Sequence, residues 1–367
     1  MKYITILAVA ALAALAIGPA CADVNFGAYA RSVAMGGAGL AVVDNPTATG
    51  AINPAAYALK SPGFRLLFPG VDFRMEGTSL SDLMDVARDV QDAKGESAIA
   101  LARELGKRNT KVEVGAYAGF IAGPVAITAD GQAAAELVPS DGFKSWANSE
   151  SSVDWVAELG DLGLAGIQDK YHADVTGRAL VSLPSVGVGF KIPNGRGLCA
   201  GLRVKFLRST VRYQRVQPSD VDLTGQPEFE AVPQPGEPEE VEDSGLGADV
   251  GFIYQTPGSK VQLTTALVLS NLIRPNLEGV GLERMISAGA ALRLSNKLLL
   301  AGDLVNINGA YDRNTQLRLG AELSPVRWFA LRAGYSGGDF TFGLGLGGLN
   351  IAVSKDTPLI VGRVWSL

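Results

Sequence analysis

Large apolar side chains alternate with glycine or polar residues along much of the C-terminal third of the chain. The clearest stretch is residues 340–347, where Phe340, Phe342, Leu344 and Leu346 alternate with a threonine and three glycines. A period of two predicts a β-strand. A strand in a soluble core gains nothing from a second face of glycine, whereas a closed barrel with an apolar outer face and a crowded lumen does. The pattern therefore predicts a membrane β-barrel.

Runs with this period continue through most of the chain after residue 63, and they amount to about 14 or 15 strand candidates. They cover residues 64–74, 112–120, 123–129, 173–182, 185–191, 202–206, 246–255, 262–270, 286–293, 297–305, 316–323, 327–335, 340–347, 348–354 and 359–366. Single-chain bacterial barrels have even strand numbers, so we expect an all-β, antiparallel transmembrane barrel of about 14 strands.

The same alternation assigns individual side chains to the two faces of the barrel. The residues expected to face lipid are Leu246, Val250, Phe252, Phe340, Phe342 and Leu344. Charged residues at the alternate positions, Arg203, Asp249 and Arg293, are expected to face the lumen.

Three long insertions interrupt the strands. Residues 79–107 and 141–168 carry apolar stripes with helical spacing, the second including Trp146 and Trp155. We expect both helical insertions to pack onto the barrel rim, the alternative being a helix on the membrane surface. Residues 217–243 hold five prolines and six glutamates, which predicts a mobile exposed loop with neither helix nor ladder.

Residues 1–22 have the three parts of a signal peptide. Lys2 supplies the charge, Ile4–Ile17 the apolar segment, and Ala20–Ala22 a small-x-small cleavage site that leaves Asp23 as the first mature residue. The alternative is a lipoprotein signal with Cys21 as the lipidated residue. An uncleaved anchor is disfavoured because the apolar run of about 14 residues is shorter than the roughly 20 that a spanning helix needs.

Composition narrows the function further. Hydrophobic residues make up 47% of the chain and charged residues 19%, and glycine accounts for 45 of 367 residues, well above its usual share of about 7%. A net charge of −5 argues against a nucleic-acid partner. His172 is the one histidine, and Cys199 is the one cysteine after the signal. The sequence therefore indicates no catalytic residue, metal site or cofactor, and we do not expect an enzyme.

The segment after the signal is rich in small residues, and its spacing resembles a known family. Glycines at 36, 37 and 39, followed by Asp44 and by Asn53-Pro54-Ala55, resemble the mature start of the long-chain fatty-acid outer-membrane transporter (FadL-type) superfamily. Residues 245–251 and 319–345 resemble a mid-barrel strand and the closing strands of the same superfamily. The match covers residues 31–60 and 244–354, and within the superfamily it is most similar to TraF-like and PorV-type barrels.

The resemblance implies that residues 23–60 fold into the lumen as a hatch and that residues 61–367 form the barrel. Small residues let an irregular backbone pack inside a barrel, where polar side chains satisfy its donors. The implied hatch residues are Gly36, Gly37, Gly39, Asp44, Asn53 and Pro54. No ligand-binding residue can be carried over. The chain departs from the family in lacking a terminal aromatic residue, although Trp365 stands two positions upstream.

Two functions follow from the resemblance. The first is passive passage of hydrophobic small molecules, such as fatty acids, through the outer membrane of a didermic bacterium. The second is a structural or interaction barrel that serves a secretion or conjugative-transfer apparatus. The expected partners are membrane lipid, the barrel-assembly machinery and, in the second case, a secretion-system protein.

Overall fold

The computed structural model describes residues 30–43, 52–59, 64–76, 103, 106–149, 153–221, 227–236, 240–257, 261–295, 297–347, 349–354 and 360–363. The expected signal peptide (1–22), Asp44, most of the expected helix over 79–107, and Trp365 lie outside the described residues.

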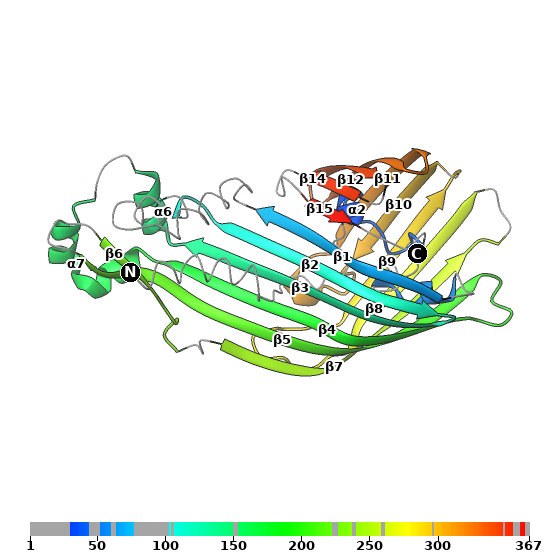
Figure 1. Ribbon diagram of the computed structural model, residues 1–367, viewed down its shortest axis with the longest axis horizontal. Helices are drawn as coiled ribbons and strands as arrows, with labels where there is room; N and C mark the ends of the chain where they lie inside the picture. The colour runs from blue at the N-terminus through cyan, green and yellow to red at the C-terminus, as the bar shows by residue number, and fades with distance from the viewer. Residues whose placement is uncertain are drawn as a thin grey trace.

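The strands form a closed antiparallel ring (Figure 1). They are β1 (Phe64–Glu76), β2 (Thr110–Ala122), β3 (Val125–Pro139), β4 (Ala173–Lys191), β5 (Leu198–Val221), β6 (Pro227–Val232), β7 (Glu240–Gln255), β8 (Gln262–Ile273), β9 (Met285–Arg293), β10 (Leu298–Val305), β11 (Gln316–Val326), β12 (Phe329–Ser336), β13 (Asp339–Leu346), β14 (Leu349–Ser354) and β15 (Ile360–Arg363). Successive strands pair with one another, β5 pairs with both β4 and β7, and β1 pairs with β15 to close the ring. β6 pairs only with β5 and stands outside the ring.

The ring therefore contains fourteen of the fifteen described strands, as the sequence predicted. The two separate candidates over 173–182 and 185–191 are one strand, β4, whose pairing register shifts between Ser182 and Ser185. A bulge breaks the period of two without ending the ladder, which is why one strand looked like two.

The outer and inner faces of the ring have opposite chemistry. Phe340 is 66% exposed and its neighbour Thr341 is 5% exposed, and the same contrast separates Leu246 from Asp249. The lipid-facing residues Phe342 and Leu344 are also exposed, and Arg203 is fully buried inside. Val250, Phe252 and Arg293 are half-buried at the alternating positions assigned to them. The assignments of these side chains to the two faces are confirmed, and they are those of a transmembrane barrel.

The barrel has one tall wall and one low wall (Figure 1). β5 has 24 residues, whereas β10 has 8. A strand of about 9–11 residues is enough to span a bilayer. Along the outward face of β5 the exposed side chains are apolar as far as Phe206 and then become charged at Arg208 and Arg212. The tall wall, formed by β3, β4, β5 and β7, therefore continues well beyond the apolar belt.

A helical cap sits at the far end of the tall wall. Helix α6 (Asp141–Asn148) is N-capped by Ser140, and α7 (Trp155–Lys170) is N-capped by Asp154. Phe143, Trp146, Trp155, Ile167 and Tyr171 form one buried cluster between them. The Glu158 carboxylate accepts a hydrogen bond from Lys170 at 2.9 Å, and this bond raises the pKa of the Lys170 ammonium. The expected helices over 141–168 and their packing onto the rim are confirmed.

The expectation of an unpaired loop over residues 217–243 is wrong. β5 runs on to Val221, β6 pairs with it, and β7 already begins at Glu240. The prolines are accommodated because Pro227 is the first residue of an edge strand and Pro218 lies beside a register shift, the two places where a ladder tolerates proline. Phe229 of β6 also packs against the aromatic cluster of the cap, which gives this segment an apolar anchor.

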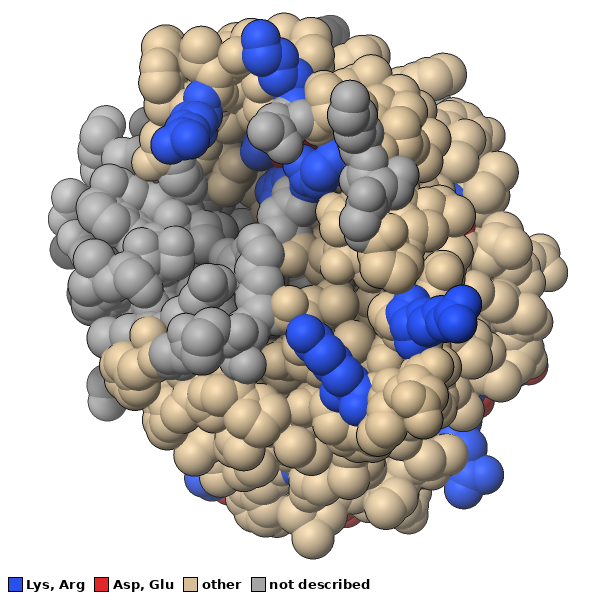
Figure 2. Space-filling model, turned by 90° about the vertical axis from the view of Figure 1, so that its right-hand side faces the viewer, with Lys and Arg blue, Asp and Glu red and all other residues tan. Residues whose placement is uncertain are grey.

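The two ends of the barrel differ in their connections and charge. Tight turns join the strands at the end that lies to the right in Figure 1 and faces the viewer in Figure 2. No described residue in those turns is acidic, whereas Lys191, Arg196, Lys297 and Arg327 are exposed at this end of the strands. The long connections, including the acidic segment around β6, lie at the opposite end. Among the described residues, no helix has the length and apolar character needed to cross a membrane.

Candidate functional site: the lumenal hatch

Two short pieces of the N-terminal segment lie against the inner wall of the barrel. One is the helix α2 (Ala30–Ala34) with the turn that follows it, and the other is the 3-10 helix η1 (Pro54–Ala58). All five residues of η1 are buried. We call the described residues 30–43 and 52–59 the hatch.

The first seat of the hatch is made of inward-facing glycines on β4, β5 and β7. A Cβ atom at Gly189 would lie 2.5 Å from the backbone nitrogen of Ala58. Cβ atoms at Gly187, Gly201 and Gly251 would overlap Tyr57, Pro54 and Asn53, respectively. The glycine face that predicted a crowded lumen is therefore occupied by the backbone of η1, which approaches the wall more closely than any side chain would allow.

Asn53 fixes the start of η1. Its side-chain oxygen accepts a hydrogen bond from the backbone nitrogen of Ala55 at 3.1 Å, and its Nδ2 donates to the carbonyl oxygen of Phe252 on β7 at 3.3 Å. Asn53 is fully buried and Pro54 follows it as the first residue of the helix. One side chain thus caps the helix and ties it to the wall.

The second seat is made of glycines on β11, β12 and β13. A Cβ atom at Gly320 would lie 2.5 Å from the carbonyl oxygen of Met35, and Gly334 and Gly343 are equally close to the hatch. On the hatch side, Gly36 has a φ of +66°, and its backbone nitrogen donates to Thr341 Oγ1 at 3.0 Å. A side chain at Gly36 would be strained by this backbone conformation and would meet the backbone of Tyr335.

A carboxylate on β11 anchors α2. Glu322 accepts two hydrogen bonds from Arg31, each of 2.8 Å, and a third from Arg332 Nε at 2.6 Å. Arg332 also donates to Asn350 Oδ1 at 2.9 Å. The Glu322 side chain is 8% exposed and that of Arg31 is 26% exposed. Two guanidinium groups therefore share one shielded carboxylate, a strong and directional arrangement.

A second carboxylate, Asp303 on β10, holds the turn after α2. Its Oδ2 accepts from the backbone nitrogens of Gly39 at 2.6 Å and of Leu40 at 3.0 Å. The neighbouring Gly37 has a φ of +79° and lies beside the Arg318 side chain. Gly36, Gly37 and Gly39 thus lie in the short segment after α2, which Thr341 and Asp303 hold against the wall.

A layer of buried ion pairs lies on the inner wall beside the first seat. Arg203 on β5 pairs with Asp130 on β3. Lys205 donates to Asp249 at 2.8 Å and to Asn271 at 3.1 Å. Each charge in this layer therefore meets an opposite charge, as buried charges require.

Of the residues proposed for the hatch, Gly36, Gly37, Gly39, Asn53 and Pro54 lie beside the barrel wall, and Asp44 lies outside the described residues. Arg31, Asp303, Glu322, Arg332 and Thr341 were not proposed as hatch contacts. A signal was present, since each of the four wall residues is polar and stands at an inward position of its strand, between neighbours on the apolar outer face. Such a residue in a barrel strand needs a lumenal partner, although the pattern does not say which one.

Comparisons with known proteins show which solved structures share this fold. No protein-family model matches the chain, and no curated protein matches it with significance. Among solved structures, the chain is similar to the Pseudomonas putida toluene transporter TodX, with a TM-score of 0.52, 14% identity, and coverage of 93% of this chain and 97% of that one. It is also similar to a monoaromatic hydrocarbon channel described as the TodX deltaS2 mutant, with a TM-score of 0.54, 13% identity, and coverage of 94% and 99%. The deltaS2S3 mutant gives a TM-score of 0.53 at 14% identity, with 93% and 98% covered.

Proposed function

We propose that this chain is an outer-membrane channel for the passive passage of hydrophobic small molecules, with the hatch as its removable obstruction. The observation that carries the proposal is the way the hatch is held. It is a separate N-terminal segment that lies inside a closed ring and is bound by glycine seats and a few polar contacts. It contributes no strand to the ring, so displacing it leaves the wall intact.

The fold supports the substrate class. The similar solved structures are described as a toluene transporter and as monoaromatic hydrocarbon channels. The outer face of the present barrel is an apolar belt with charged residues beyond it. In barrels of this kind the short turns face the periplasm and the long loops face the outside. The cationic turn end then faces the periplasm, and the cap faces outward. Residues 1–22 would direct export, and the barrel-assembly machinery would insert the mature chain.

Removal of residues 31–57 tests the proposal. The strands begin at Phe64, so the shortened barrel is expected to assemble and to show the heat-dependent gel mobility of a folded barrel. Conductance in planar bilayers should rise, and vesicles should lose selectivity for hydrophobic over hydrophilic probes. A shortened barrel that assembles and conducts no better than the parent would refute the role of the hatch.

A protein-interaction barrel is the second candidate, and the cap favours it. Val156 on α7 is 64% exposed, and Leu162 and Leu164 of the same helix are also exposed. This role is the one that the resemblance to TraF-like and PorV-type barrels, expected from residues 31–60 and 244–354, would imply. If Val156→Glu reproduces in cells the defect of a strain that lacks the protein, while probe uptake by vesicles stays normal, the interaction role is the better assignment.

A further inference from the structure

The tight turns at one end of the barrel carry positive charge and no negative charge. They are the connections over residues 123–124, 192–197, 256–261, 294–297, 327–328 and 347–348. In the sequence they hold four cations, Arg196, Lys260, Lys297 and Arg327, and neither aspartate nor glutamate. Figure 2 shows Lys and Arg side chains on this end of the molecule and hardly any Asp or Glu. We call Arg196, Lys297 and Arg327, the three that the structure describes, the cationic collar.

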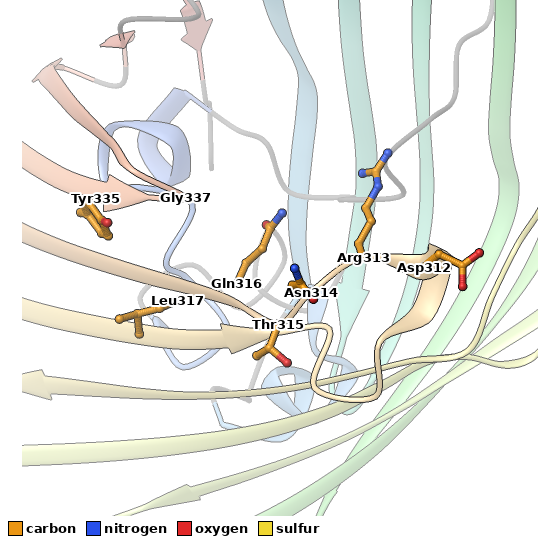
Figure 3. A pocket seen from close by; sticks show the side chains of 8 residues that line it. All are labelled: Asp312, Arg313, Asn314, Thr315, Gln316, Leu317, Tyr335 and Gly337. Carbon is orange, nitrogen blue, oxygen red and sulfur yellow. The ribbon is translucent and has the colours of Figure 1, made fainter.

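The charge of the collar is not balanced by carboxylates of the described residues. All three side chains are exposed, and none has an ion-pair partner within the described part of the chain. Charges at the opposite end are mixed. Arg208 pairs there with Glu242 at 2.7 Å, and Figure 3 shows Asp312 next to Arg313 on the loop before β11. The collar therefore presents its charge to groups outside this part of the chain.

The turn that carries Arg327 lies at the edge of the apolar belt. Arg327 and Trp328 are the two residues between β11 and β12, and the preceding Val326 is exposed. Trp328 is 63% exposed, and its ring centroid lies 6.0 Å from that of Phe329. Tryptophan is enriched at membrane–water boundaries, because its ring is apolar and its N–H is polar. Trp328 thus places Arg327 at the level of the lipid headgroups.

The other two collar turns also combine charge with apolar surface. Leu294 is exposed in the connection that holds Lys297, and Phe190, which is 53% exposed, precedes the turn that holds Arg196. The three turns join β4 to β5, β9 to β10 and β11 to β12, so the cations are spread around the ring. Such a spread suits lipid that surrounds the barrel better than a protein that contacts one side.

The turn that carries Arg196 is held firmly. The backbone nitrogen of Ile192 donates to the carbonyl oxygen of Leu198 at 2.9 Å, and the carbonyl oxygen of Gly197 accepts from the nitrogen of Gln255 at 3.0 Å, at the end of β7. Arg196 itself has a φ of +42°, which side-chain-bearing residues rarely adopt. The backbone that presents this guanidinium is therefore already ordered, which lowers the entropy lost when a ligand binds.

We propose that the cationic collar binds the headgroups of anionic phospholipids around the barrel. A guanidinium donates two parallel hydrogen bonds to a phosphate, and an ammonium attracts it as a point charge. With the turn end toward the periplasm, these lipids belong to the inner leaflet of the outer membrane. β10 and β12 have only 8 residues each, so the headgroups would fix the depth of the low wall. The inference takes only this orientation from the proposed function, and lipid binding requires no passage of solute, so the two can fail separately.

Quenching of Trp328 fluorescence by brominated lipid tests the collar at Arg327. The protein is reconstituted in phosphatidylcholine vesicles with a small fraction of brominated phosphatidylglycerol or brominated phosphatidylcholine. Every variant carries Trp365→Phe, and Trp146 and Trp155 are buried in the cap. Phosphatidylglycerol should quench Trp328 more strongly than phosphatidylcholine does. Arg327→Gln should lower this preference about fivefold, the effect of one basic residue at an anionic membrane surface, and Arg327→Lys should keep it.

The matched control is Arg212→Gln. Arg212 is 59% exposed and pairs with Glu240 beyond the apolar belt, so its loss should leave the lipid preference at Trp328 unchanged. A second probe, Phe190→Trp in a Trp328→Phe background, should report the same preference beside Arg196 and lose it in Arg196→Gln.

Three results would overturn the proposal. Equal quenching of Trp328 by the two lipids in the parent shows that the collar does not select anionic headgroups. An unchanged preference in Arg327→Gln shows that this cation is not what the lipid binds. Equal quenching together with binding of soluble polyglutamate, lost in Arg327→Gln, would assign the collar to an acidic protein partner instead.

Discussion

Replacing Glu322 by glutamine should loosen the hatch without harming the barrel. The substitution keeps the shape of the side chain and removes the charge that Arg31 and Arg332 share. Breaking a buried ion pair costs about 3–5 kcal/mol. Arg31 is partly exposed and glutamine retains one acceptor, so we expect a smaller loss of about 2 kcal/mol in the free energy that holds α2. At 1.4 kcal/mol per factor of ten, the detached population rises about thirty-fold.

Backbone hydrogen exchange measures that population directly. The amide protons of Gly36, Gly39 and Leu40 are bonded to the wall through Thr341 and Asp303, so they exchange only when the hatch leaves its second seat. Their exchange should accelerate about thirty-fold in Glu322→Gln, and bilayer conductance should rise in parallel.

The matched control for this experiment is Glu242→Gln. Glu242 pairs with Arg208 on the outside of the tall wall, where both side chains are at least half exposed and the pair contributes about 0.2–1 kcal/mol. It should leave the exchange of the hatch amides unchanged. Exchange in Glu322→Gln within a factor of two of the parent would refute the claim that this carboxylate holds the hatch.

Two further predictions concern the glycine seat and the lipid face. Gly201→Val should displace η1, because any Cβ atom at this position overlaps the hatch, and the assembled barrel should then show a higher conductance. Gly160→Ala is the control: a Cβ atom there has no other atom within 4 Å, so the conductance should stay that of the parent. Phe342→Arg should lower the stability of the barrel by about 2–4 kcal/mol in refolding titrations into vesicles, because it places a charge on the lipid face. Ser244→Arg, which faces outward beyond the apolar belt, should refold like the parent, and equal losses in both variants would contradict the assigned depth.

The faces of the barrel could be predicted from the sequence because one physical rule sets them. Phe342 faces lipid and its neighbour Gly343 faces the hatch. The alternation of apolar residues with small or polar ones therefore predicts which side chains point outward and which point inward. The ends of the tall strands could not be predicted in this way. Beyond Phe206 the outward positions of β5 become Arg208 and Arg212, and the apolar alternation stops although the ladder continues.

The partners of the hatch were beyond the reach of a local pattern. Asn53 could be proposed because the Asn53-Pro54-Ala55 segment resembles the superfamily, and its capping bond is local, to Ala55. Arg31 bonds to a residue 291 positions later, and nothing near either residue in the sequence specifies the other. Inward polar residues such as Asp303 show that a lumenal partner exists, and only the fold identifies it.

The separation between α2 and its seat imposes an order on folding. Arg31 and Gly36 leave the ribosome long before Glu322 and Thr341, which bind them and lie 291 and 305 positions later. Contacts of such long range form late, because the chain between them must first be arranged. The last third of the barrel must therefore exist before α2 can bind. A chain that lacks some of its closing strands would keep its N-terminal segment undocked and exposed. Docking of that segment therefore reports that the barrel is complete.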